Sequence, residues 1–159
     1  MWWVPKMSAG ILLHRVTPDG VPEVLLVHPG GPLWAKKDDG VWSVPKGEVE
    51  QDSDPATTAE REFTEELGTP PPPGPRIDLG EITQRSGKRV RAWAVAGDLD
   101  ETAARSNTFE MEWPRGSGRI ESYPEVDRAA WFTLSEARQK LNEAQGALID
   151  RLALILDSL

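Results

Sequence analysis

Apolar residues in the first part of the chain fall into short runs separated by turn-forming residues. The run 8–16 is almost continuously apolar and predicts a buried strand. A turn signal at 18–20 separates it from a second run over 21–28, so the two runs predict a β-hairpin. A loop rich in glycine, proline and charged residues follows over 29–40. The segment 41–44 then predicts another short strand.

The clearest helical pattern lies over 55–67, between residues that favour the two ends of a helix. Asp54 is a good N-cap residue, proline suits the first helical position, and Gly68 is a C-terminal stop. Apolar residues recur along this helix at the spacing of one face, which we expect to pack against the core. That predicted stripe consists of Ala56, Ala59, Phe63 and Leu67.

The chain continues with a proline-rich segment, 69–75, which is incompatible with helix and predicts an extended surface connection. Apolar and polar residues then alternate over 76–84 and 88–98, which predicts a second hairpin. The segment 107–113 predicts a further strand, and 114–124 predicts a loop.

The C-terminal part predicts a last strand over 128–133, a helix from about Ser135 and a closing helix over 147–156. Strands with intervening helices indicate a mixed α/β layered fold. Neither flank of the proline-rich segment is long enough for a second core, so we predict that 1–159 forms one domain.

Composition narrows the possible functions. Hydrophobic residues make up 38%, and the formal net charge of -8 disfavours a nucleic-acid partner. The absence of cysteine excludes thiolate metal sites, and two histidines supply a zinc site poorly. Without a run of ~20 apolar residues or a signal-like N-terminus over 1–6, we expect a cytoplasmic protein with no membrane partner. The sequence leaves monomer and homodimer open.

Three glutamates lie side by side on the predicted helix. Glu62 is separated from Glu65 by three positions and from Glu66 by four, and like charges at this spacing destabilise a helix by a few tenths of a kcal/mol per pair. Arg61 is the only cation nearby. A hard cation over the cluster would account for it, because magnesium prefers carboxylate oxygens. The alternative is a solvated acidic face, which the three glutamates alone would favour.

The spacing around these glutamates resembles the Nudix box, G-x5-E-x7-R-E-U-x-E-E-x-G-U, where U is a bulky apolar residue. The segment 47–69 carries this pattern, and it implies the Nudix fold, an α/β/α sandwich with a mixed central sheet. The longer pattern is similar to predicted bacterial NTP pyrophosphohydrolases of this family. The positions that match the box in register are Gly47, Arg61, Glu62, Phe63, Glu65, Glu66 and Gly68.

Two positions depart from the box. Thr69 replaces the last apolar residue, which is a minor change. Ser53 stands where the first glutamate is expected, and that glutamate commonly helps to hold a metal ion. The departure therefore bears on metal count and rate rather than on family membership. Nearby carboxylates that could take over are Asp52, Asp54, Glu48 and Glu50, although Asp54 is also the candidate helix cap.

The resemblance implies Mg²⁺- or Mn²⁺-dependent hydrolysis of a diphosphate linkage in a nucleoside diphosphate derivative, an NTP or a dinucleoside polyphosphate, by metal-activated water. Arg61 would orient a helix carboxylate through a salt bridge. The metal ligands that it implies are Glu62, Glu65, Glu66, Glu125 and the carbonyl group of Gly47.

The catalytic base varies within the family, so Glu62, Glu66 and a carboxylate outside the box compete for that role. Glu125 is the outside candidate, because it precedes a tryptophan-bearing strand as a glutamate often does in Nudix proteins; the alternative is an ordinary loop carboxylate. The predicted catalytic residues are Glu65, Glu66, Arg61 and Glu125. Weaker outside candidates are Glu110, Glu112 and Glu121.

Substrate contacts are predicted from charge and aromatic residues. The segment 42–47 resembles the entry to the box in diadenosine polyphosphate hydrolases, where Lys46 could meet a phosphate or simply offset the neighbouring acids. Lys88 could supply a further cation to the substrate; the alternative is that it is solvated. A nucleobase could stack on Trp34 or Tyr123. A competing hypothesis, favoured by the serine at position 53, is a catalytically weak or inactive Nudix domain that binds a nucleotide or a protein partner. The tryptophans expected in the core are Trp42, Trp93 and Trp131.

Overall fold

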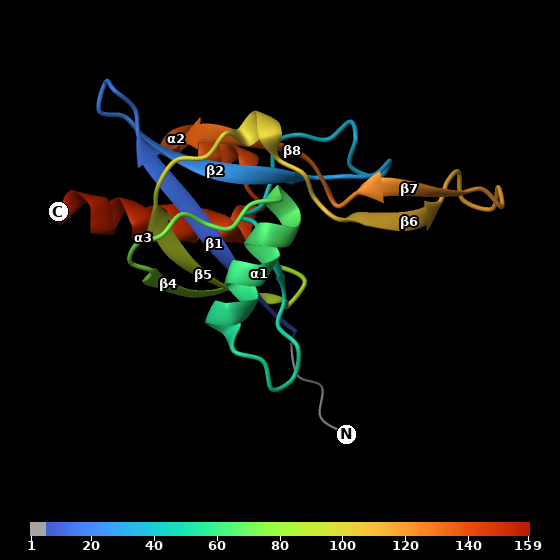
Figure 1. Ribbon diagram of the computed structural model, residues 1–159, viewed down its shortest axis with the longest axis horizontal. Coiled ribbons are helices and arrows are strands. Elements are labelled where there is room, and N and C mark those ends of the chain that lie inside the picture. Colours follow the sequence, from blue (N-terminus) through green and yellow to red (C-terminus); the bar gives the residue numbers. More distant parts are fainter. Residues whose placement is uncertain (1–5) are drawn as a thin grey trace.

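The computed structural model describes residues 6–159, and Figure 1 shows a central sheet with helices on both of its faces. Residues 1–5, whose composition predicts no secretion signal, lie outside the described residues. The strands are β1 (Met7–Val16), β2 (Pro22–Pro29), β3 (Lys46–Glu48), β4 (Ile77–Thr83), β5 (Arg89–Ala96), β6 (Thr108–Glu112), β7 (Ile120–Pro124) and β8 (Val126–Thr133). The helices are α1 (Pro55–Leu67), α2 (Leu134–Lys140) and α3 (Gly146–Asp157), with short 3-10 turns η1 (Glu101–Ala103) and η2 (Glu143–Gln145).

The main sheet has six strands in the order β4-β5-β1-β2-β8, and β3 pairs with the first part of β1. Strand β1 runs parallel to β5 and antiparallel to β2 and β3, so the sheet is mixed, as predicted. Both predicted hairpins are present as the antiparallel pairs β1–β2 and β4–β5. Strands β6 and β7 form a separate two-stranded ribbon.

The alternation of side chains along β1 separates two apolar layers. Ile11 and Leu13 point toward α1, whereas Leu12 points toward the layer that contains α2 and α3. Each of these three side chains is fully buried. The sheet therefore lies between helices on both faces, and the structure confirms the predicted α/β/α sandwich with a mixed central sheet.

Helix α1 begins and ends as its sequence predicts. The side chain of Asp54 accepts a hydrogen bond from the backbone N–H of Thr57 at 3.1 Å, and Gly68 ends the helix with a φ of 77°. The predicted stripe is wrong at one position, because Ala56 is exposed and Thr58 is buried instead. An alanine adds so little apolar area that it does not determine which face of a helix is buried.

Two further predictions are corrected by the structure. The expected strand 41–44 forms only isolated bridges, and the paired strand lies at β3. The expected loop 114–124 contains β7, which the alternation of apolar residues did not reveal. Strand β7 pairs only with β6 and adds no side chain to the buried core, so its sequence shows no buried face.

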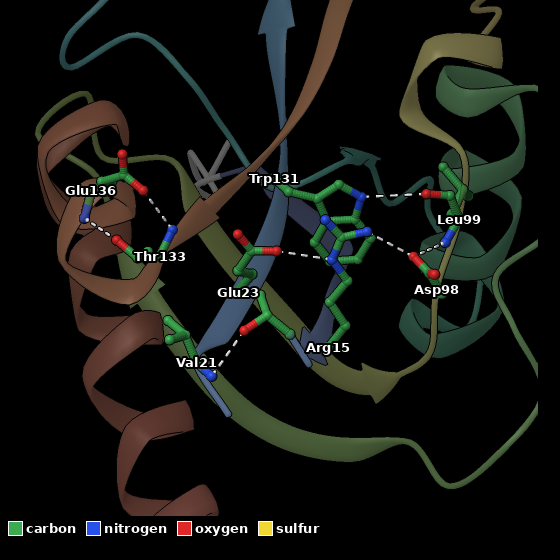
Figure 2. A network of polar contacts seen from close by, with 9 residues as sticks. Arg15, Val21, Glu23, Asp98, Leu99, Trp131, Thr133 and Glu136 are labelled. Carbon is green, nitrogen blue, oxygen red and sulfur yellow. Dashed lines mark hydrogen bonds and ion pairs between the residues drawn. The ribbon is translucent and has the colours of Figure 1, made fainter. Parts of the chain in front are cut away.

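Two of the three tryptophans expected in the core, Trp42 and Trp93, are buried, whereas Trp131 is half-buried. The guanidinium group of Arg15 lies 3.9 Å from the centre of the Trp131 ring, and the Trp131 indole N–H donates to the Leu99 carbonyl at 3.3 Å (Figure 2). Arg15 also forms ion pairs with Glu23 on β2 and with Asp98 on the loop after β5.

None of the described helices is long and apolar enough to span a membrane.

Gly10 allows β3 to approach β1 closely. A Cβ atom at Gly10 would lie 2.5 Å from the Pro45 carbonyl oxygen and 2.8 Å from the Cβ of Lys46, whereas one at Gly146 would meet open space. A side chain at position 10 would therefore push β3 outward.

We expect Gly10→Ala to lower the free energy of unfolding by more than ~1 kcal/mol, because overpacking of this kind typically costs ~1–3 kcal/mol. The matched variant Gly146→Ala should raise it by ~0.4–1 kcal/mol, because it restricts only the unfolded chain. Urea denaturation followed by circular dichroism measures both. Changes of the same sign in the two variants would contradict this view of the β1–β3 contact.

Candidate functional site

The box residues from β3 and α1 meet at one place. Gly47 lies directly beneath Glu62, because a Cβ atom built on this glycine would overlap the carboxylate of the glutamate. The Glu62 side chain is only 15% exposed. The missing side chain at position 47 thus makes the space in which a carboxylate from α1 reaches the backbone of β3.

Glu66 lies one helical turn further along α1 and lines a cavity of about 210 Å³. Lys46 and Glu125 line the same cavity, although they come from β3 and from the junction between β7 and β8. The predicted residues of the box and the predicted outside carboxylate are therefore brought together. The apolar part of the wall, which the sequence did not reveal, includes Val27, Val41, Val44 and Val126.

Negative charge in this site is only partly compensated. Burial raises the pKa of the Glu66 carboxyl group to about 8; Lys46 opposes this rise through its charge and its backbone N–H, whereas Glu62 and Glu125 add to it. Burial also raises the pKa of Glu62, with a further contribution from Glu65. Two neighbouring acids that both resist ionisation indicate a place where a cation would be stabilised.

Lys46 and Lys88 supply positive charge beside these acids. Burial lowers the pKa of the Lys46 ammonium group, and the charge of Lys88 lowers it further, while Glu66 and Glu62 raise it. The two predicted phosphate-binding lysines are thus close enough to interact electrostatically. On β5, Arg89 and Arg91 instead form ion pairs with carboxylates on β4, at 3.1 and 2.6 Å.

Arg61 forms ion pairs with carboxylates of its own helix. Its Nη2 atom lies 3.4 Å from an oxygen of Glu62, and its Nε atom lies 3.7 Å from an oxygen of Glu65. These contacts are those that an arginine orienting a helix carboxylate would make. The arginine side chain is 47% exposed, so each ion pair adds little to stability.

Glu125 is held by its backbone at the base of the β6–β7 ribbon. Its carbonyl accepts from the Gly30 N–H at 2.9 Å, and its own N–H donates to the Asn107 carbonyl at 2.9 Å. The Asn107 N–H in turn donates to the Glu65 carbonyl at 3.0 Å. This chain of backbone hydrogen bonds connects Glu125 to the end of α1 that carries the glutamates.

The two predicted stacking residues do not line the Glu66 cavity. Trp34 is 38% exposed, and the ammonium group of Lys37 lies 5.1 Å from the centre of its ring. The ring of Tyr123 lies 6.0 Å from that of Phe109, which covers Gly31. Phe109 was missed by the sequence analysis, and only its place in the strand pattern could have indicated its aromatic contact.

The carboxylates that could replace the missing box glutamate differ in their surroundings. Asp54 is occupied as the cap of α1, and Asp52 has a positive φ of 66°. Glu48 lies 3.6 Å from the ammonium group of Lys6. Glu50 is exposed, and its carbonyl accepts from the N–H of Ser53 at 3.0 Å.

The donor groups suit a hard divalent cation. In residues 6–159, no three acidic or histidine side chains lie close enough to hold a metal ion by themselves. Magnesium, however, needs only one or two carboxylates, with waters and substrate phosphates completing its shell. Glu62, Glu66 and the Gly47 carbonyl are oxygen donors at one place, and the raised pKa values of both acids fit a missing positive charge.

Comparison with known families matches residues 5–152 to the family described as NUDIX domain. The chain belongs to the NUDIX family. This finding confirms the family that the box resembles.

Among similar proteins, one from Mycobacterium tuberculosis named "Putative 8-oxo-dGTP diphosphatase 3" is 40% identical over 121 residues, which cover 70% of this chain and 53% of the relative. The chain thus spans about half the length of this relative. A Caenorhabditis elegans Ap4A hydrolase in a binary complex has a TM-score of 0.66 at 20% identity, covering 96% and 99% of the two chains. The NUDIX domain of Shewanella oneidensis NrtR complexed with ADP ribose has a TM-score of 0.67 at 16% identity, covering 98% and 90%. These structural likenesses show the fold alone.

We expect Gly47→Ala to preserve folding of this Nudix domain and to weaken Mn²⁺ binding by about 10–100-fold, because the new methyl group displaces the Glu62 carboxylate. Isothermal titration calorimetry with Mn²⁺ gives the affinity, and thermal unfolding in EDTA checks the fold. Gly146→Ala is the control and should bind Mn²⁺ like wild type. Unchanged Mn²⁺ affinity in Gly47→Ala would remove Glu62 and Gly47 from the candidate metal site.

Proposed function

We propose that this Nudix protein uses Mg²⁺ or Mn²⁺ to hydrolyse a diphosphate linkage in a nucleoside diphosphate derivative, with an NTP or a dinucleoside polyphosphate as the first candidates. The observation that carries the proposal is the partly buried pair Glu62 and Glu66 beside Gly47, with Glu125 facing the same cavity. The relative named for 8-oxo-dGTP supports adding an oxidised purine nucleotide to the candidates.

Glu62, Glu66 and the Gly47 carbonyl would hold the cation, with Glu65 as a further ligand. When bound, the cation supplies charge that neutralises the diphosphate and lowers the pKa of a water molecule. Arg61 keeps the carboxylates of α1 in position through its contacts with Glu62 and Glu65.

Lys46 and Lys88 lie where they can bind the phosphate oxygens as point charges, because their charges interact with each other and Lys46 lines the cavity. Glu125 lies on the cavity wall but outside the box segment, and it is a candidate to accept the proton of the attacking water. Glu66 is the competing base, since its raised pKa makes its carboxylate a stronger proton acceptor than an ordinary glutamate.

A second candidate function is a catalytically weak Nudix domain that binds a nucleotide or a protein partner. Ser53 favours it, because the position of the first box glutamate lacks a carboxylate and the adjacent Asp54 is used as a helix cap. Trp34 and Tyr123 stay proposed stacking residues in either function. The cytoplasmic location and the choice between monomer and homodimer stay predictions.

We expect Glu65→Gln and Glu66→Gln each to lower kcat/KM by at least ~10²-fold, because charge stabilisation by a metal is worth several kcal/mol in the transition state. The assay measures Mg²⁺-dependent turnover of NTPs, 8-oxo-dGTP, diadenosine polyphosphates and nucleotide sugars. Glu60→Gln is the matched control, since it removes a charge from the same helix at a residue paired with Arg76 at 2.8 Å. Turnover that is equal in wild type and both site variants would exclude the assigned roles.

We expect Ser53→Glu to increase Mn²⁺ affinity or kcat, because it restores a carboxylate at the start of α1 where the box has one. Ser53→Gln is the control for side-chain size, and it should give no increase because it adds no charge. Calorimetry with Mn²⁺ and the turnover assay measure the two quantities. Absence of any gain would mean that another carboxylate already fills the place.

A further inference from the structure

The β6–β7 ribbon, residues 108–124, extends away from the body of the molecule and is called the arm below (Figure 1). Within residues 6–159 its two strands pair only with each other, so both outer edges of the arm lack a strand partner. An isolated two-stranded ribbon is at best marginally stable in water, and free strand edges favour association with another chain. The arm is therefore a surface that would gain stability from a partner.

One face of the arm is mostly apolar. Residues directly opposite in an antiparallel pair share a face, and successive residues alternate between faces. Trp113 belongs to this face, because its N–H donates to the Arg119 carbonyl at 3.0 Å and thus continues the ladder, and its side chain is 37% exposed. From base to tip, the opposed residues on this face are Phe109 with Tyr123, Met111 with Glu121, and Trp113 with Arg119.

The charges of the arm are separated along its length. Acidic residues lie on the strands, and basic residues lie toward the tip. None of them forms an ion pair within the described residues. The acidic residues are Glu110, Glu112 and Glu121, and the basic residues are Arg115 and Arg119. Glu121 and Arg119 lie on the same face as Met111 and Trp113, whereas Glu110 and Glu112 lie on the other face.

We propose that the arm is the contact surface for a second copy of this chain, packed antiparallel across a two-fold axis. On the face of Met111 and Trp113, Glu121 lies nearer the middle and Arg119 lies nearer the tip, so the complement of this face is the same face inverted, which is the property of an isologous interface. With the axis midway between Glu121 and Arg119, each Glu121 meets Arg119 of the partner subunit. Met111 then packs on Trp113 of the partner subunit.

Other surfaces of the sheet are less suited to strand association. At the β4 edge, the guanidinium group of Arg151 donates to the carbonyls of Leu79 and Glu81 at 2.9 and 3.0 Å. At the opposite edge, β8 packs against η1. The net charge of -8 makes nonspecific contact between two copies unfavourable, so the reciprocal ion pairs of the arm select the orientation. Because six residues per copy bury less than the ~800 Å² per partner of stable complexes, we expect a micromolar dissociation constant.

The test exchanges charge at the two positions that the two-fold axis brings together. Glu121→Arg alone and Arg119→Glu alone each place like charges opposite one another, so each should weaken the homodimer by at least ~10-fold. An equimolar mixture of these two variants should recover a dimer, because oppositely charged residues then meet at both places: the two substituted positions form one ion pair with reversed signs, and the unsubstituted Glu121 and Arg119 form the other with its original signs. Sedimentation velocity across micromolar concentrations measures the oligomeric state, and circular dichroism checks the fold of each variant.

Glu143→Arg is the control, because it makes the same charge change outside the arm and should leave dimerisation unchanged. Met111→Asp should also weaken the dimer, since it places a charge in the apolar part of the face. A monomeric wild type throughout the micromolar range would overturn the proposal. So would a dimer that resists both charge reversals, or a mixture of the two variants that stays monomeric.

Discussion

The close contact between β3 and α1 is the constraint on which the rest of the site depends. It requires two positions without side chains: Gly10 lets β3 lie against β1, and Gly47 leaves room for the carboxylate of Glu62. Asp54 and Gly68 then set where α1 begins and ends, and so which turns of the helix face β3. Small residues in the sheet thus determine where acidic residues of the helix can be placed.

This placement has an electrostatic cost. Glu62 and Glu66 are partly buried, and both have raised pKa values because their charged forms lose hydration and are repelled by neighbouring carboxylates. Lys46 offsets only part of this cost, since its own ammonium group is destabilised by burial and by Lys88. An arrangement that opposes its own ionisation is unfavourable for a purely structural acidic face, and it suits a site whose missing charge arrives with a ligand.

Much of the fold could be predicted because its elements have local causes. The apolar run of β1, the cap at Asp54 and the stop at Gly68 each act within a few residues, and the structure has them where they were expected. The box predicted the grouping of glutamates because the spacing of a single helix fixes their relative positions. Strand β7 was missed because it lies in an exposed ribbon, where neither face is buried in the core.

The cavity could not be predicted, because its wall comes from separate parts of the chain. Val27, Val41 and Val126 have no periodic relation to the box, and only the pairing of β2 with β8 brings two of them near Glu66. The contact of Phe109 with Gly31 depends in the same way on the path of distant segments. Sequence spacing predicts the relative positions of residues within one helix, but it gives no information about the distances between separate elements.

The attachment of Glu125 has a mechanical consequence. The residue follows the last position of β7; its N–H donates to the Asn107 carbonyl at the root of the arm, and its carbonyl accepts from the N–H of Gly30, just after β2. Because those ties involve no side chain, substitutions cannot readily uncouple them. A change in the direction of the hairpin relative to the sheet would therefore displace Glu125 on the cavity wall, although the hairpin itself lines no part of that cavity.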